Sequence, residues 1–121
     1  MDNHFQSSKP IYLQIAYQIF YQLVRKELLP GDKLPSVREM AIQTKVNPNT
    51  IQRTYSEMER LGIVETRRGQ GTYIAEKAEI VDELKDRLTR EVLEGFVKQM
   101  TELGLTKEEM AERIKTFTEG S

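Results

Sequence analysis

The chain has 121 residues, a length that allows one compact domain with an appendage and excludes two sizeable cores. Its 38% hydrophobic and 31% charged residues are typical of an ordinary globular protein and exclude a disordered or membrane-embedded one. The net charge of −1 is unevenly distributed along the chain. Residues 1–75 carry 10 Lys and Arg against 7 Asp and Glu (+3), whereas residues 76–121 carry 8 against 12 (−4). Such an asymmetry is expected of a protein that binds a polyanion with its basic part.

Secretion, membrane insertion and catalysis find no support in the sequence. The longest nearly apolar stretch, Ile11–Val24, contains three glutamines and is too polar to span a bilayer. The N-terminus lacks the basic start and apolar segment of a secretory signal and the chain has no cysteine, so we expect a cytoplasmic protein without a membrane partner. The chain has a single histidine, His4, and no cysteine thiol. We therefore expect that the protein is not an enzyme and that it has no metal site and no cofactor.

The first predicted helix follows a polar stretch, residues 1–9, which predicts a flexible N-terminal arm. Pro10 suits the first turn of a helix. Apolar residues then recur every four positions, as one face of an amphipathic helix requires: Ile11, Ile15, Ile19 and Leu23. We expect this helix to reach about Leu29, where Pro30-Gly31-Asp32 breaks it.

Two short helices are predicted next, close together in the chain. Ser36 and Glu39 have the spacing of a capping box, so a second helix begins there and ends near Lys45. Asn47 is a strong N-cap type and Pro48 suits a first turn, which predicts a third helix over residues 48–61. Two helices separated by so short a turn indicate a helix-turn-helix.

A small β-hairpin is predicted directly behind the third helix. Residues 63–68 and 72–75 have the pattern of two short strands, and Gly69-Gln70-Gly71 joins them. A hairpin in this place is the wing of a winged-helix domain. We therefore expect a mainly α fold with a small β-hairpin, in which residues 10–75 form a winged helix-turn-helix domain for DNA binding.

Residues 76–121 are predicted to form a two-helix tail. One helix covers about residues 77–103, and Thr106 with Glu109 three residues later caps another. Because a lone apolar face would be left in water and 46 residues can hardly enclose a drug-sized pocket of roughly 300 Å³, we expect the tail to pair two copies. The apolar residues expected at this dimer interface are Ile80, Leu84, Leu88, Val92, Phe96, Met100, Met110, Ile114 and Phe117.

The polar face of the third helix is the strongest candidate for DNA recognition. Its amide and hydroxyl side chains are followed by Arg53, and these groups match base edges in the major groove: Asn or Gln on adenine, Arg on guanine. The candidate residues at its start and on this face are Asn47, Asn49, Gln52 and Arg53. An ordinary solvated helix face is the alternative.

Further basic residues lie on the second helix and at the hairpin. Arg38 and Lys45, near the two ends of the second helix, are candidates for phosphate or base-edge contacts. Arg67 and Arg68 lead into the turn that contains Gln70, where small residues let the backbone approach a minor groove. The alternative is a tight turn with two solvated arginines.

Four segments in this order resemble the GntR family of bacterial transcription regulators, and the short helical tail resembles its YtrA-type subgroup. The segments are P-I-Y-L-Q-I at 10–15, P-G-D-K-L-P-S-V-R-E-M-A at 30–41, V-N-P-N-T-I-Q-R at 46–53 and R-R-G-Q-G-T-Y-I at 67–74. Their ordered co-occurrence is specific, and the resemblance runs through the whole chain.

The resemblance implies roles for three residues. Arg38 matches the family's arginine at the start of the second helix, which contacts DNA, while Thr50 matches a threonine of the recognition helix and Gly71 the wing glycine near the minor groove. Many members have arginine where this chain has Gln52, and often a basic or polar residue where it has Pro48, so their base preference does not transfer. The subgroup implies control of a nearby operon, often with the regulator's own gene and transport genes.

We expect a sequence-specific repressor that binds double-stranded DNA as a homodimer. Two-fold symmetry predicts a palindromic operator whose half-sites lie about 34 Å apart. A small-molecule effector, of chemistry that the sequence does not identify, would bind at the dimer interface or between tail and DNA-binding domain. The alternatives are a winged-helix module that binds protein, which would present an apolar third helix, and a nonspecific nucleoid protein, which would bind without base preference.

Overall fold

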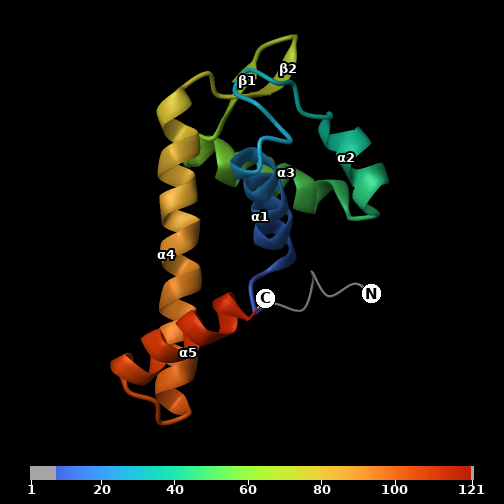
Figure 1. Cartoon of the computed structure of the whole chain (residues 1–121). Coiled ribbons are helices and arrows are strands. Elements are labelled where there is room, and N and C mark those ends of the chain that lie inside the picture. Colours follow the sequence, from blue (N-terminus) through green and yellow to red (C-terminus); the bar gives the residue numbers. More distant parts are fainter. Residues whose placement is uncertain (1–7, 121) are drawn as a thin grey trace. The chain divides into compact units, whose positions relative to one another are not determined.

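The computed structural model describes residues 8–120, and most of the predicted arm, residues 1–9, lies outside them together with His4. Within this range the chain forms α1 (Ile11–Val24), α2 (Val37–Thr44), α3 (Pro48–Arg60), β1 (Val64–Arg67), β2 (Gly71–Ile74), α4 (Ala78–Glu102) and α5 (Lys107–Glu119) (Figure 1). The predicted order of helices and strands is confirmed. Among the described helices, none is long and apolar enough to cross a membrane.

The chain divides into two compact units, residues 1–84 and residues 85–121. The first unit holds α1, α2, α3, the hairpin and the first turns of α4. Leu84, in the part of α4 that belongs to this unit, is buried at 3% exposure. The DNA-binding domain at residues 10–75 and the dimerisation tail at 76–121 stay predictions.

Three helices and the hairpin enclose the core of the first unit. α3 packs against α1, α2 and β1 (Figure 1). The largest fully buried side chains include residues from each of α1, α3 and β2: Phe20, Ile15, Leu23, Ile51, Met58 and Ile74. Of the apolar face predicted for the first helix, Ile15, Ile19 and Leu23 are buried, whereas Ile11 is 39% exposed.

The first helix ends at Val24, five residues before the predicted end near Leu29. Lys26 adopts a left-handed conformation with φ 64°, its amide donates to the carbonyl of Leu23, and the Glu27 amide donates to the carbonyl of Gln22. These two bonds form a Schellman motif, which closes the last turn of a helix. The prediction was wrong because the left-handed residue is a lysine, where glycine is the usual signal.

The predicted starts of the second and third helices are confirmed. In the capping box of α2, the Ser36 hydroxyl accepts from the Glu39 amide at 3.1 Å and the Glu39 carboxylate accepts from the Ser36 amide at 2.9 Å. Lys45, with φ 57°, ends α2 in a left-handed conformation and reverses the chain. Asn47 then caps α3, whose first residue is Pro48.

The hairpin is tied to the segment that precedes α2. β1 and β2 pair antiparallel in a register that sets Val64 opposite Ile74. On the other side of β2, Lys33 bridges Tyr73, and the Leu34 amide donates to the carbonyl of Thr72 at 2.8 Å. The wing is therefore held from both sides of β2, which fixes its base against the helix-turn-helix.

The tail departs from the single apolar face expected for it. Successive i, i+4 positions turn about 40° around a helix, so the series from Ile80 to Met100 winds about 200° around α4. Leu88 is accordingly buried within the chain at 6% exposure, whereas Val92 is 62% exposed. On α5, whose predicted capping box is confirmed, Met110 is buried at 5% while Phe117 is 75% exposed. The residues expected at the dimer interface thus differ in exposure: buried within the chain are Leu84, Leu88 and Met110, half-buried are Ile80, Phe96 and Met100, and exposed are Val92, Ile114 and Phe117.

Candidate nucleic-acid interface

The exposed face of α3 carries the side chains that the sequence singled out. Asn49, Gln52 and Arg53 are exposed, and Thr50 is half-buried. The Gln52 side-chain amide donates to the Ser56 hydroxyl at 3.4 Å along the same face. Since Ile51 and Met58 are fully buried on the opposite side, the rotation of α3 about its axis is fixed and this polar row must face outward.

The first turn of α3 is prepared for a negatively charged group. The Asn47 side-chain oxygen accepts from the Asn49 amide at 2.7 Å, which leaves the side-chain amide group of Asn47 exposed at the helix start. Pro48 has no amide hydrogen to be satisfied. The Thr50 and Ile51 amides donate to the main-chain carbonyl of Asn47, so the first turn offers a negatively charged group the side-chain amide of Asn47 and the positive end of the helix dipole.

Arg53 is oriented by a residue of α1. Its guanidinium carbon lies 4.0 Å from the ring centroid of Tyr12. The Thr54 hydroxyl donates to the main-chain carbonyl of Tyr12 at 2.8 Å, which joins α1 and α3 at this level. The arginine is exposed but supported on one side by an aromatic face, and its donors are directed into solvent.

Arg38 and Lys45 are exposed near the two ends of α2. Neither makes an ion pair with any residue between 8 and 120. Lys45 occupies the turn between α2 and α3, next to the Asn47 cap. Both are thus available as cations beside the polar face of α3.

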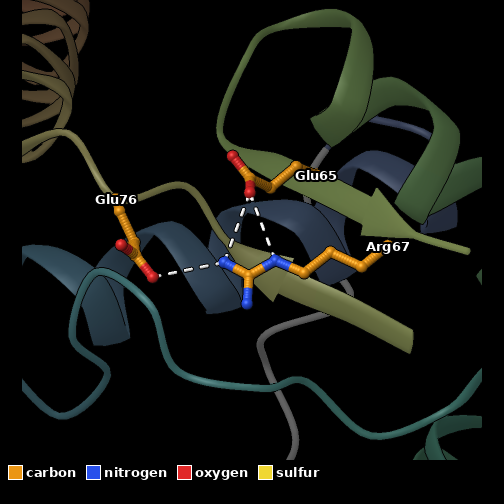
Figure 2. A network of polar contacts seen from close by, with 3 residues as sticks. All are labelled: Glu65, Arg67 and Glu76. Atoms are coloured by element: carbon orange, nitrogen blue, oxygen red, sulfur yellow. Dashed lines mark hydrogen bonds and ion pairs between the residues drawn. The ribbon is translucent and has the colours of Figure 1, made fainter. Parts of the chain in front are cut away.

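The two arginines of the wing differ in what they contact. Arg67 bonds the Glu65 carboxylate at 3.3 Å and the Glu76 carboxylate at 3.2 Å (Figure 2), and its guanidinium lies 4.0 Å from the ring centroid of Tyr73. Desolvation, which lowers the pKa of Arg67, is outweighed by these hydrogen bonds, so its pKa is raised. Arg68 is exposed and forms no ion pair among the described residues. Arg67 therefore stabilises the hairpin, and Arg68 is the arginine open to a ligand.

The turn of the wing owes its shape to glycine. Gly69 has φ +74° and Gly71 has φ +125°, a conformation that other residues rarely adopt. A Cβ on Gly71 would lie 2.9 Å from Cε of Lys33, so the missing side chain also makes room for that lysine. Gln70, at the tip, is exposed.

A shallow groove separates the start of α2 from the hairpin. Its charged lining residues are the cations Lys33, Arg67 and Arg68 and the carboxylate of Glu39, whose side chain is bonded to the Ser36 amide. Cations and main-chain groups from the wing and from α2 thus meet along one depression, and a polyanion backbone has the complementary charge and shape.

Two side chains at this interface were not identified as candidates from the sequence. Tyr12 lies on α1, and its role beneath Arg53 depends on how α1 packs against α3. Lys33 lies in an extended segment, and its proximity to Gly71 depends on the bridge to β2. Neither relationship has a signal in local spacing.

The family model described as "Bacterial regulatory proteins, gntR family" matches residues 11–74, from the start of α1 to the end of the wing. The chain belongs to the GntR family. This match covers each element that carries the interface described above, so the GntR winged helix-turn-helix is the DNA-binding part of a transcription regulator.

Two curated relatives match nearly the whole chain. The HTH-type transcriptional regulator YhcF of Bacillus subtilis is 93% identical over 120 residues, which are 99% of each chain. The HTH-type transcriptional repressor YtrA of the same organism is 43% identical over 93% of this chain and 88% of its own. The tail is thus included in both matches, consistent with the YtrA-type subgroup.

Solved structures of GntR proteins share this fold. A GntR family transcriptional regulator from Listeria monocytogenes is 39% identical with a TM-score of 0.83, over 96% of this chain and 98% of that one. The DNA-binding domain of AraR in complex with operator ORX1 is 27% identical with a TM-score of 0.53, over 55% of this chain and 81% of that one. That domain was solved on operator DNA.

Proposed function

We propose that this GntR regulator represses transcription as a homodimer that occupies a palindromic operator in a nearby operon, with its own operon as the first candidate. α3 enters the major groove with Asn49, Gln52 and Arg53 towards the base edges. The wing lies near the minor groove, where Arg68 and Gln70 reach the backbone.

The observation that carries this proposal is the rigidly oriented polar face of α3. Its buried side is fixed by Ile51 and Met58, its start is capped by Asn47, and Arg53 rests on Tyr12. A surface prepared in this way loses little side-chain entropy on binding, which favours sequence-specific contacts. Repressor function is supported by the name of YtrA, and operator binding by the AraR complex.

Selection of bound fragments from random DNA by the purified full-length protein tests the proposal. We expect an enriched two-fold-symmetric motif bound about a thousandfold or more tightly than unrelated duplex. Binding without base preference would support a nucleoid protein instead, and failure to retain any duplex at low salt would favour a protein-binding module. A transcription assay on the enriched site then separates repression from activation.

The exposed apolar residues of the tail support the homodimer. Val92, Leu93 and Phe117 are more than half exposed, and a second copy is the partner that a two-fold operator requires. A small-molecule effector would bind at the dimer interface. A regulator that binds the operator of a bacterial operon acts in the cytoplasm, where that DNA is.

A further inference from the structure

One face of α4 forms a groove that α5 does not line. The α4 groove consists of Asp86, Thr89, Arg90, Leu93, Glu94, Val97 and Lys98. Leu93 is 56% exposed and Val97 is 37% exposed, and they form its apolar part. All of its residues belong to the second compact unit, residues 85–121.

The charged residues of the α4 groove alternate in sign along the helix. Asp86, Arg90, Glu94 and Lys98 follow one another at i, i+4 spacing, and all four are exposed. None of them forms an ion pair with a residue in the described part of the chain, although Arg87 beside them pairs with Glu91 at 3.6 Å. The groove therefore presents an ordered row of unneutralised charges beside exposed apolar side chains.

This row is complementary to itself in only one direction. If a second α4 runs antiparallel and the two-fold axis passes at the level of Val92, positions equally far before and after that level face each other. Arg90 then faces Glu94 of the second copy, and Asp86 faces Lys98 of the second copy. Symmetry produces each pair twice. In a parallel pair the two-fold axis runs along the helices, so the row of one copy lies opposite the other edge of the second copy and the four charges do not pair with one another.

We propose that the α4 groove is the dimer interface and that two α4 helices pair antiparallel in this register. The inference rests on the proposed homodimer and adds its orientation and its contacts. Leu93 and Val97 supply the apolar seam, and the charges at its edge select the register, because exposed ion pairs add little affinity but like charges in contact are strongly disfavoured.

An antiparallel pair also suits a two-fold operator. In an antiparallel pair the N-termini of the two α4 helices lie at opposite ends of the pair. Two recognition helices must reach half-sites about 34 Å apart. A parallel pair would start both helices side by side.

Charge reversal of the central pair tests the register. Arg90→Glu sets two carboxylates against each other at both symmetric contacts, and Glu94→Arg does the same with two guanidinium groups. We expect each full-length variant alone to dimerise at least about tenfold more weakly than the parent at low salt. A mixture of the two variants should regain much of the parent's affinity. In the heterodimer the two substituted residues face each other, and the two original residues face each other. Each of these two contacts again joins a positive and a negative charge. Lys85→Glu, an exposed cation of α4 outside the groove, is the matched control and should leave the affinity unchanged.

The measurement is sedimentation equilibrium of the parent, both variants, their mixture and the control, with far-ultraviolet circular dichroism to verify equal helix content. Variants as dimeric as the parent, or weakened variants that do not recombine, would overturn the register. A parent that stays monomeric at every concentration refutes the homodimer of the proposed function itself. At about 1 M salt the differences between variants should shrink, since the Debye length falls to about 3 Å.

Discussion

The guanidinium of Arg53 stacks on the ring of Tyr12, 4.0 Å from its centroid, so that a residue of α1 orients a residue of the recognition helix. The Thr54 hydroxyl holds the backbone beneath this contact by donating to the Tyr12 carbonyl at 2.8 Å. A guanidinium that stacks on an aromatic ring keeps the N–H groups along its own edge free. These groups can donate hydrogen bonds to O6 and N7 of a guanine.

Removal of the aromatic ring should weaken operator binding through Arg53. We expect Tyr12→Leu to reduce affinity about two- to fivefold, the equivalent of about 0.5–1 kcal/mol for an exposed cation–π contact. Tyr12→Phe keeps the ring and serves as the control. Anisotropy titrations against the operator and its single-base variants should show that Tyr12→Leu relaxes discrimination at the base that Arg53 reads; an equal loss on every sequence would argue against this positioning role.

Arg53→Ala should cost on the order of 1 to 3 kcal/mol of operator affinity and relax discrimination at one base pair in each half-site. The reason is that a bidentate arginine distinguishes guanine from other bases, whereas a phosphate contact does not. The measurement is the same titration series. If affinity falls uniformly across all base variants, Arg53 contacts the backbone instead.

The two wing arginines should differ in their salt dependence. Arg68→Ala should lower the log-log slope of affinity against salt by about 0.9 for each phosphate lost, hence about 1.8 for a dimer. Arg67→Ala should leave the slope nearly unchanged, because Glu65 and Glu76 already hold that guanidinium (Figure 2), and should instead lower the thermal midpoint of unfolding. Equal slopes for the two variants would contradict this assignment of roles.

Most of the fold could be predicted because its boundaries are set by local chemistry. The capping box at Ser36, the cap at Asn47 and the two glycines of the wing each satisfy or permit a specific backbone geometry within a few residues. The end of α1 was missed because Lys26 takes the left-handed position that glycine usually marks.

Local sequence patterns did not predict the exposure of residues in the tail or the side-chain contacts of Tyr12 and Lys33. The i, i+4 series on α4 suggested one apolar face, but it winds around the helix, so Leu88 is buried within the chain while Val92, the next member of the series, is exposed. Leu88→Lys would thus destabilise the fold and is no test of dimerisation. The contacts of Tyr12 and Lys33 depend on helix crossing and strand pairing, which only the three-dimensional structure supplies.

Gly71→Ala should destabilise the first unit more than Gly69→Ala does. At Gly71 the φ of +125° lies in a region that alanine rarely adopts, whereas the φ of +74° at Gly69 is close to the left-handed helical region that alanine can adopt at a cost. The Cε of Lys33, 2.9 Å from the new Cβ at Gly71, belongs to a flexible side chain that can move away. We expect a loss of about 1–3 kcal/mol for Gly71→Ala and about 1–2 kcal/mol for Gly69→Ala. Urea denaturation of both variants measures the difference, and identical midpoints would contradict the greater backbone strain at Gly71.

Tyr55 links α3 to the segment before α2, and its ionisation should affect stability at alkaline pH. Its hydroxyl donates to the carbonyl of Pro35 at 2.7 Å, and burial, with a smaller contribution from Glu39, raises the pKa of Tyr55 from 10.0 to about 12. Tyr55→Phe leaves the Pro35 carbonyl without this donor and should cost about 1–2 kcal/mol near neutral pH.

The sign of the pH dependence follows from the raised pKa. Because the folded state holds the phenolic proton more tightly than the unfolded chain, the stabilisation by Tyr55 is complete below pH 10 and is lost as the pH rises towards 12. The difference in unfolding free energy between the parent and Tyr55→Phe, measured by urea titration, should therefore narrow over that interval. Contributions that the two proteins share cancel in this difference. A gap for Tyr55→Phe that stays constant to about pH 11.5 would show that burial does not raise the pKa of Tyr55 in the folded protein.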